Sequence, residues 1–355
     1  MFSLALITLA LTSVVSFATP AKRAPALEIS LSAPTSVHSI DDIKVTAAVT
    51  NTGSEAIKVL KYGTVLDGNM PTRSFTVSKD GVLADFVGIK LSVDMNEIGE
   101  EAFVTIPAGE TVTVDHEVAP LYNFESLGTG MYTFEPVTTF QIIGDDAKPN
   151  AFEVSAASFK VDVKHDVAAR ELKVLDKRAK NACTSSSYTS FISSSYSEGK
   201  TLASIASSYV ASNGANSLFK SYFGSTSTST VRNVLNNVAN ENSSSRTLNC
   251  SDPYGACTSG VIAYTVISTT NVYFCSLFYS EVTTSKLCSG TSVASRNIRG
   301  GTVLHELTHA TSGTVDVGYG CSYDQSLGSS SPSQAAKNAD NYNCFATQVY
   351  ASTQC

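Results

Sequence analysis

The spacing of hydrophobic residues divides the chain into a strand-like first half and a second half with helical stripes. From Leu27 to about His165, short alternating runs are separated by turn-forming sequences such as Pro107–Glu110. The clearest runs are Ile43–Thr46, Phe103–Ile106, Thr111–Val114 and Phe159–Val163. Short strands at this spacing are typical of two packed antiparallel layers. We therefore predict a β-sandwich over about residues 27–165.

The second half has helical spacing that is interrupted by one strand-forming segment. Two stripes recur at i, i+3, i+4 and i+7, namely Leu202, Ile205, Ala206, Tyr209 and Val231, Val234, Leu235, Val238. Between them and the C-terminus, Val261–Ile267 and Val272–Cys275 predict a small β-hairpin. A helix is expected from Arg299 to Gly313, where glycine suits the C′ position, and a last helix from Pro332 to about Tyr350. This half is predicted to be mainly α (α+β).

Charge changes at the same boundary. From Ala179 onward there are nine Lys/Arg and eight Asp/Glu, which leaves fifteen and twenty-three of the totals of 24 and 31 for the preceding part. Neither part has the basic stripe of a nucleic-acid-binding protein. Between the parts, the charged and helix-prone stretch Asp166–Asp176 ends in Lys177-Arg178, a pair that a dibasic processing protease would cut.

The N-terminus and the cysteines indicate secretion. Phe2–Val15 is a short apolar run followed by the small-x-small pattern that ends at Ala18, so residues 1–18 are predicted to be a signal peptide rather than a membrane anchor or a buried helix. No later segment is long and apolar enough to be transmembrane. All eight cysteines lie after residue 178, and an oxidising compartment predicts four disulfides. Asn242 begins an Asn-Ser-Ser acceptor for glycosylation.

The strongest chemical signal is the HExxH motif His305-Glu306-Leu307-Thr308-His309. On a helix, residues i and i+4 share a face, so both imidazoles can bind one Zn²⁺. Glu306 lies beside that face and can act as the general base toward water. No other histidine follows residue 178, which favours a metal site over an accidental pair.

A catalytic zinc ion takes three protein ligands and keeps one open position. The extended pattern HExxHxxGxxH is absent, Glu306 is the last Glu of the chain, and the cysteines are expected to be oxidised. The downstream acids that remain are Asp316, Asp324 and Asp340. Asp316 follows a Gly-Thr turn that can fold the chain back toward the helix, and is the best candidate.

The run Gly313–Gly320 (GTVDVGYG) fits the GTxDxxYG signature that follows HExxH in the deuterolysin-like aspzincins, a family of secreted fungal metalloendopeptidases that this chain resembles over its whole length. The resemblance implies a single Zn²⁺ per mature chain, Asp316 as the third ligand, and Tyr319 as a donor to the oxyanion; a packing role is the alternative for Tyr319. It also implies a precursor, with a pro-region at 19–178 that is a β-sandwich pro-domain plus charged linker, and a zincin-like mature metallopeptidase domain at 179–355. The implied disulfides are Cys183–Cys250, Cys257–Cys275 and Cys288–Cys355, with Cys321–Cys344 as an additional pair.

Asp340 resembles a further acidic residue of the family, placed near the primed-side pocket or behind a ligating His; an ordinary helix-surface Asp is the alternative. Lysine-specific relatives are expected to carry a second acid where this chain has Asn343, so we predict broad specificity with at most a mild preference for basic residues. Val272–Cys275 is expected to be the edge strand on which substrate pairs.

The expected partners are protein or peptide substrates, the chain's own pro-region and a dibasic processing protease, with no nucleic acid and no membrane. Two other functions stay open. One is a secreted disulfide-rich binding protein with a non-catalytic HExxH, and the other is a zinc amidase that acts on a non-peptide amide.

Overall fold

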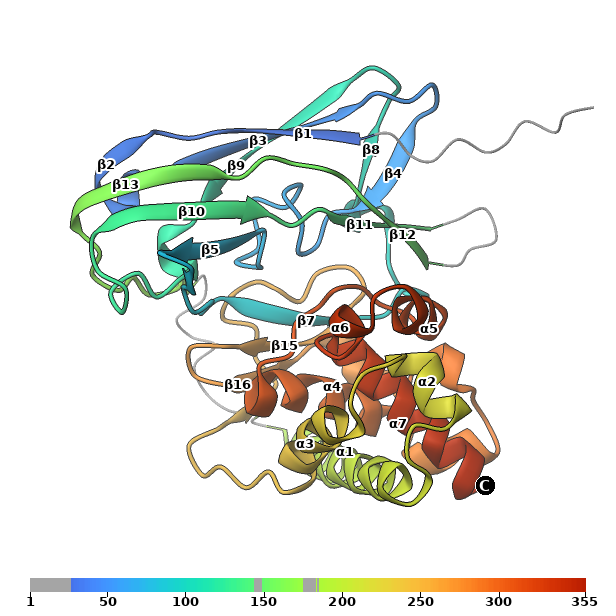
Figure 1. Ribbon diagram of the computed structural model, residues 1–355. Coiled ribbons are helices and arrows are strands. Elements are labelled where there is room, and N and C mark those ends of the chain that lie inside the picture. Colours follow the sequence, from blue (N-terminus) through green and yellow to red (C-terminus); the bar gives the residue numbers. More distant parts are fainter. Residues whose placement is uncertain (1–26, 144–148, 175–182, 184) are drawn as a thin grey trace, which may run out of the picture.

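The computed structural model describes residues 27–143, 149–174, 183 and 185–355 (Figure 1). The predicted signal peptide and the pair Lys177-Arg178 therefore lie outside the described residues.

The N-terminal part forms two facing layers of strands (Figure 1). One layer has the order β1 (Leu27–Ser32), β3 (Lys44–Asn51), β9 (Thr111–Glu117). The other has the order β2 (Ser36–Ser39), β13 (Phe159–Asp166), β10 (Gly130–Pro136), β5 (Phe75–Lys79), β6 (Val82–Leu83). Two antiparallel pairs complete this part, β4 (Ile57–Leu60) with β8 (Phe103–Ile106) and β11 (Thr139–Ile143) with β12 (Pro149–Glu153). The four strands expected from the clearest runs are present as β3, β8, β9 and β13, and among these pairs only β2 and β13 run parallel.

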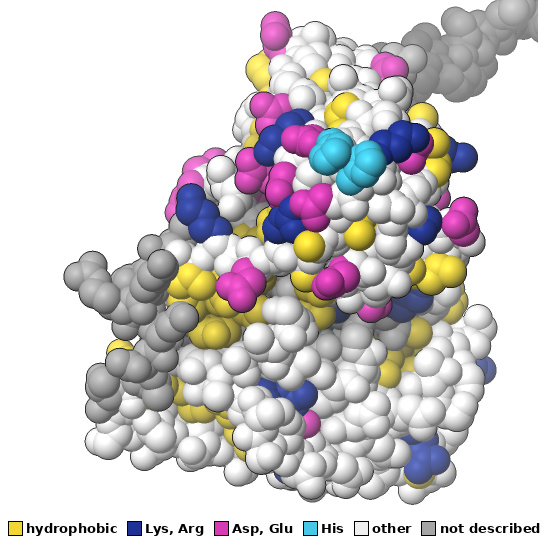
Figure 2. All heavy atoms as spheres, turned by 90° about the vertical axis from the view of Figure 1, so that its left-hand side faces the viewer, with side chains coloured by type: hydrophobic (Ala, Val, Ile, Leu, Met, Phe, Trp, Pro, Cys, Tyr) yellow, Lys and Arg dark blue, Asp and Glu magenta, His cyan; other side chains and the backbone are white. Residues whose placement is uncertain are grey.

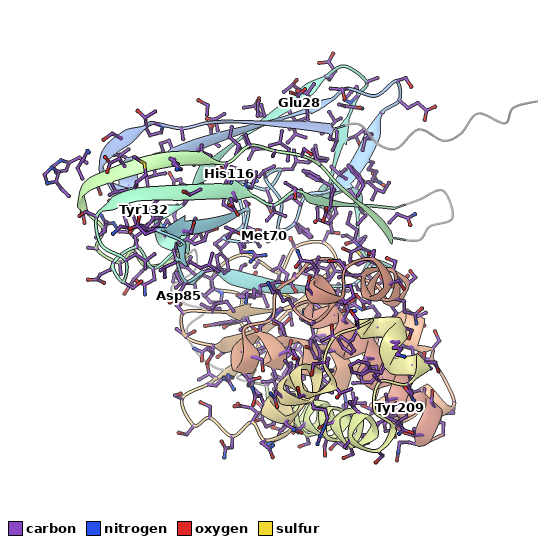
Figure 3. The ribbon with its side chains drawn as sticks, viewed as in Figure 1. Glu28, Met70, Asp85, His116, Tyr132 and Tyr209 are labelled. Atoms are coloured by element: carbon purple, nitrogen blue, oxygen red, sulfur yellow. A yellow bond between two sulfur atoms is a disulfide. The ribbon has the colours of Figure 1, made fainter. Side chains whose placement is uncertain are left out.

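Alternation along the strands builds the core between the layers. In β3, Val45, Ala47 and Val49 are fully buried, whereas the residues between them are partly exposed. His116 on β9 is also buried in this part (Figure 3), where its Nε2 lies 3.0 Å from the carbonyl oxygen of Val65 and burial lowers its pKa. His116 therefore behaves as a core residue with a backbone partner.

The C-terminal part is mainly helical. Its helices are α1 (Ser186–Asn213), α2 (Ser217–Phe223), α3 (Thr228–Ala239), α4 (Arg299–Ser312), α5 (Cys321–Ser330), α6 (Pro332–Ala335) and α7 (Ala339–Thr353). Helix α4 packs against α1, α3 and α7, so it lies inside this part rather than at its surface. The four disulfides join the pairs expected from the family resemblance. Among the described residues, no helix has the length and apolar character needed to cross a membrane.

The two parts share one sheet. Its order is β14 (Leu248–Asn249), β16 (Asn271–Phe274), β15 (Val261–Val266) and β7 (Ile89–Val93), and β7 comes from the N-terminal part of the chain. The expected hairpin is present as β15 and β16. The expected edge strand, however, was wrong: β16 lies between β14 and β15, and the far side of β15 is covered by β7.

Two further expectations differ from the structure. Residues 167–174 are not helical, because Arg170 binds Asp41 and Asp166 and so holds this segment against the β-rich part. The last helix is divided into α6 and α7, because Val315 pairs with the backbone of residues 337–339 between them.

Charge follows the division into parts. Acidic and basic side chains gather on the β-rich part in the face shown, whereas the helical part is mostly uncharged there (Figure 2). The contrast agrees with the charge counts of the two halves of the sequence.

Candidate metal centre

The HExxH motif lies on α4, which close packing holds in place. Gly300 and Gly301 face neighbouring helices, and a Cβ at either position would collide with side chains of Glu198 and Asn343 respectively. Helix α4 ends at Gly313, whose φ of 68° is in the left-handed region that favours glycine. The chain then turns back under the helix, which brings Asp316 to the motif.

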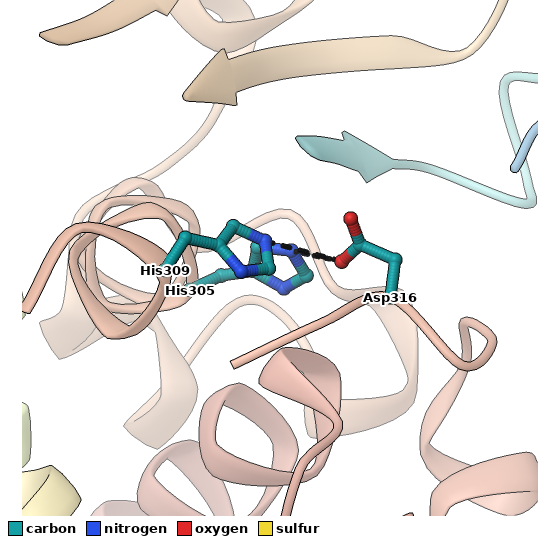
Figure 4. Close-up of side chains that lie close together, drawn as sticks. All are labelled: His305, His309 and Asp316. Carbon is teal, nitrogen blue, oxygen red and sulfur yellow. Dashed lines mark hydrogen bonds and ion pairs between the residues drawn. The ribbon is translucent and has the colours of Figure 1, made fainter. Parts of the chain in front are cut away.

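The structure brings His305, His309 and Asp316 together (Figure 4). Oδ1 of Asp316 lies 3.2 Å from Nε2 of His305 and 3.1 Å from Nε2 of His309. One ligand atom from each of the three residues lies within 4.8 Å of the others. Two imidazole nitrogens and one carboxylate oxygen around one point form a ligand set that zinc accepts.

Groups behind both histidines orient their rings. Nδ1 of His309 lies 2.8 Å from the carbonyl oxygen of Thr314, so this nitrogen donates and Nε2 keeps its lone pair. Nδ1 of His305 lies 3.5 Å from Oδ1 of Asp340, which is fully buried. The hydrogen bond to Thr314 fixes the tautomer and the orientation of His309, and the carboxylate of Asp340 lies behind the ring of His305 at ion-pair distance.

Buried atoms without partners test whether a metal fits this site. Oε1 of Glu306 has no hydrogen-bond partner among the described residues, and Nε2 of His309 makes no hydrogen bond there although Oδ1 of Asp316 lies 3.1 Å away; both side chains are buried. Burial alone would raise the pKa of Asp316, but His309 and His305 hold it well below its usual range. An ionised carboxylate and an imidazole lone pair at one buried point fit a dication.

Glu306 and Tyr319 lie beside the three ligand residues. Oε2 of Glu306 accepts a hydrogen bond of 2.6 Å from Oγ1 of Thr265 on β15, and burial raises the pKa of Glu306 to about 8. The hydroxyl of Tyr319 donates to the carbonyl oxygen of Leu91 at 3.3 Å. One oxygen of Glu306 is therefore fixed by Thr265, and the other is free to accept a proton.

Strand β7 covers the site. The carbonyl oxygen of Leu91 lies 3.0 Å from Nε2 of His305, and the amide of Leu91 donates to Oδ2 of Asp316 at 2.9 Å. The side chain of Lys90 is buried, and its Nζ donates to the carbonyl oxygen of Thr314 at 2.5 Å. A backbone carbonyl of the N-terminal part thus lies against the ligand cluster.

Asp340 has partners that favour one of its expected positions. Its Oδ1 binds the guanidinium of Arg296, and its Oδ2 accepts from the amide of Gly320 at 2.7 Å. The carboxylate lies behind His305 and is not a helix-surface residue. Asp324 is buried as well, but it lies outside the ligand cluster and accepts a hydrogen bond from Asn338.

Sequence reasoning missed Thr265, Arg296 and β7. Thr265 is one of several β-branched residues in its strand, and nothing in its spacing distinguishes it from the others. Arg296 has φ of 47°, an uncommon backbone conformation for a residue other than glycine, but the sequence gives no sign of it.

A family model and curated relatives identify the family of this chain. The model of the deuterolysin metalloprotease family matches residues 1–353. The peptidyl-Lys metalloendopeptidase of Armillaria mellea is 33% identical and covers 91% of this chain and 92% of its own length. Penicillolysin of Penicillium citrinum is 30% identical, with 91% of each chain covered. Among solved structures, a zinc peptidase from Grifola frondosa is 28% identical over 46% of this chain and 96% of its own, with a TM-score of 0.38.

Proposed function

Since the chain belongs to the deuterolysin metalloprotease family and is a zinc endopeptidase, we propose that His305, His309 and Asp316 bind one zinc ion and that Glu306 is the general base. The observation that supports this most strongly is the convergence of the three ligand atoms within 4.8 Å, with a buried carboxylate beside them. When bound, the zinc ion would supply Lewis-acid chemistry toward the peptide carbonyl and the attacking water.

The two oxygens of Glu306 have separate roles in this mechanism. Oε2 is held by Thr265, and Oε1 has no partner, so Oε1 accepts the proton of the attacking water. Glu306 then passes that proton to the leaving nitrogen. The hydroxyl of Tyr319 donates to the carbonyl oxygen at which negative charge develops, as it now donates to Leu91.

We further propose that the protein is made as a secreted zymogen, with a signal peptide at 1–18, a pro-region at 19–178 and a mature enzyme at 179–355. The contacts of β7 support this. A peptide strand that lies at the ligand cluster prevents a substrate from reaching it. A cut after Lys177-Arg178 by a processing protease would break the covalent link between the mature domain and the pro-region that carries β7, so that β7 can leave the site.

The enzyme is proposed to have broad specificity. The carboxylate of Asp340 is paired with Arg296, so little of its charge is available to a basic side chain of the substrate. Any preference for basic residues is therefore expected to be mild, although one relative is named a peptidyl-Lys metalloendopeptidase. A cleavage-site profile on a mixture of peptides tests this, and cleavage confined to bonds before lysine would contradict it.

Glu306→Gln tests the assignment of the base. The substitution keeps the size of the side chain but removes its ability to accept a proton. The variant should bind zinc and fold as the wild type does, while casein hydrolysis falls by several orders of magnitude, on the scale of about 10²–10⁴-fold for general-base catalysis. Wild-type hydrolysis by this variant would show that another group is the base.

A further inference from the structure

Strand β7 lies on β15 as a bound peptide would. The two strands are antiparallel, with Leu91 opposite Tyr264 and Val93 opposite Val261. The pairing continues past Val93, where the amide of Asp94 donates to the carbonyl oxygen of Gly260 at 2.8 Å. An extended peptide that adds a strand to an exposed edge gains its affinity from such main-chain hydrogen bonds.

One carbonyl of β7 occupies the position of a reacting carbonyl. The oxygen of Leu91 is close to Nε2 of His305 and also accepts from the hydroxyl of Tyr319. In the proposed mechanism the hydroxyl of Tyr319 donates to the carbonyl under attack, and His305 is one of the residues that would hold the zinc ion beside that carbonyl. In this register, the bond between Leu91 and Ser92 corresponds to the bond that is cut.

A charged side chain binds β7 two residues further on. Nη1 of Arg296 donates to the carbonyl oxygen of Val93 at 2.5 Å. The side chain of Arg296 is 3% exposed, and its Nη2 is held by Asp340, so the direction of the guanidinium is fixed. Asp340 also lies behind His305, which joins this arginine to a ligand residue through one carboxylate.

Departure of β7 would leave Nη1 of Arg296 without the carbonyl that now accepts its hydrogen bond, while Nη2 stays paired with Asp340. Within the described residues, the carbonyl of Val93 is the hydrogen-bond partner recorded for Nη1, and Nε of Arg296 has no partner. A hydrogen bond to a charged donor contributes more than one between neutral groups, so the site favours a peptide that returns a carbonyl to the same place.

We infer that Arg296 is a substrate-binding residue that holds the carbonyl of the second residue after the cut bond, and that β7 shows the register in which substrate lies on β15. This inference rests on the proposed function and adds to it the direction and register of the substrate. It predicts that the enzyme distinguishes peptides by whether they extend two residues beyond the cut bond, whatever the side chains are.

Two peptides of one sequence test the inference. The short peptide ends one residue after the cut bond, as an amide, and the long peptide has one more residue, a valine. The full chain is produced with Glu306→Gln and cut at the dibasic pair, and fluorescence anisotropy gives the dissociation constant of each labelled peptide. The same two peptides are then used as substrates of the activated wild-type chain, with kcat and KM measured separately.

The long peptide should bind the Glu306→Gln chain about 10- to 100-fold more tightly than the short one, because it adds a hydrogen bond to a charged donor. Adding Arg296→Met should remove most of that gain, so that the long and the short peptide bind this chain with nearly the same dissociation constant. Arg299→Met is the matched control, since Arg299 binds Glu198 on α1; it should keep the gain. In hydrolysis, Arg296→Met should lower the ratio of kcat/KM for the long peptide to kcat/KM for the short peptide.

Several results would overturn the inference. One is an equal loss for both peptides in Arg296→Met, which would indicate a structural role. Another is a gain in affinity of about twofold or less from the added residue in the Glu306→Gln chain that keeps Arg296. That result does not depend on whether the Arg296→Met chain folds. If the proposed function were wrong, the activated wild-type chain would cut neither peptide, while the binding measurement would still report on Arg296.

Discussion

Replacement of Thr265 by valine removes the hydroxyl that donates a hydrogen bond to the proposed general base, Glu306, and changes little else. Oγ1 of Thr265 donates to Oε2 of Glu306 at 2.6 Å, and both side chains are fully buried. Valine has nearly the same shape as threonine, so the packing of β15 on α4 is preserved. The substitution therefore tests how far catalysis depends on the fixed orientation of this carboxylate.

The size of the effect follows from the contact that is lost. A hydrogen bond to a charged group contributes about 1.5–3 kcal/mol, and an unpartnered buried carboxylate is strongly disfavoured. Since both oxygens of Glu306 would then lack partners, the carboxylate can rotate away from the water or take up a proton. We expect kcat to fall by about tenfold or more, with a smaller change in KM. The assay is hydrolysis of a fluorogenic peptide by the activated chain, with zinc content and thermal unfolding measured on the same sample.

Two controls isolate the hydroxyl. Thr265→Ser keeps the donor and should keep most of the activity. In a chain that already carries Glu306→Gln, adding Thr265→Val should have little further effect on the residual rate, because the two residues act as one unit. Wild-type kcat in Thr265→Val would refute the role assigned to this contact.

Three other predictions follow from the site and from the core beside it. Asp316→Asn should lower zinc affinity, because a neutral amide is a poorer ligand than a carboxylate, whereas Asp324→Asn should not; the reverse result in metal analysis would move the third ligand. A full chain in which Lys177-Arg178 is replaced by Ala-Ala should stay inactive toward casein, and high activity of this uncut chain would refute the zymogen proposal. Burial raises the pKa of Glu281 to about 8 from its ordinary 4.5, so the native state binds a proton that the unfolded chain releases, and stability should fall as pH rises through this window. Glu281→Gln should flatten the fall of stability with pH, measured by thermal unfolding between pH 5 and pH 8. An unchanged pH dependence in this variant would count against a raised pKa of Glu281.

Local patterns predicted the elements of the site. The HExxH spacing and the glycine at position 313 depend only on helix geometry, so α4 and its end could be placed from a short stretch of sequence. The strand alternation of β3 and β9 depends on which face is buried, and that too is a local pattern. These elements appear in the structure close to the residues expected.

The long-range contacts could not be predicted in the same way. Strand β7 is buried at every position, so its sequence shows no alternation, and its partner β15 lies far along the chain. The choice of β16 as the edge strand failed in a similar way, since β14 pairs with the side of β16 that was expected to be free. Arg296 is similar, because its importance comes from the backbone of Val93 and from Asp340, neither of which is near it in the sequence.

The most direct test of the central claim is the zinc content of the activated chain, measured together with its casein hydrolysis before and after chelation. We predict about one zinc ion per chain, loss of hydrolysis when the metal is removed, and recovery when zinc is returned. A folded, activated chain that holds no zinc, or that hydrolyses casein equally well after complete removal of the metal, would contradict the assignment of His305, His309 and Asp316 as the ligands of a catalytic zinc ion.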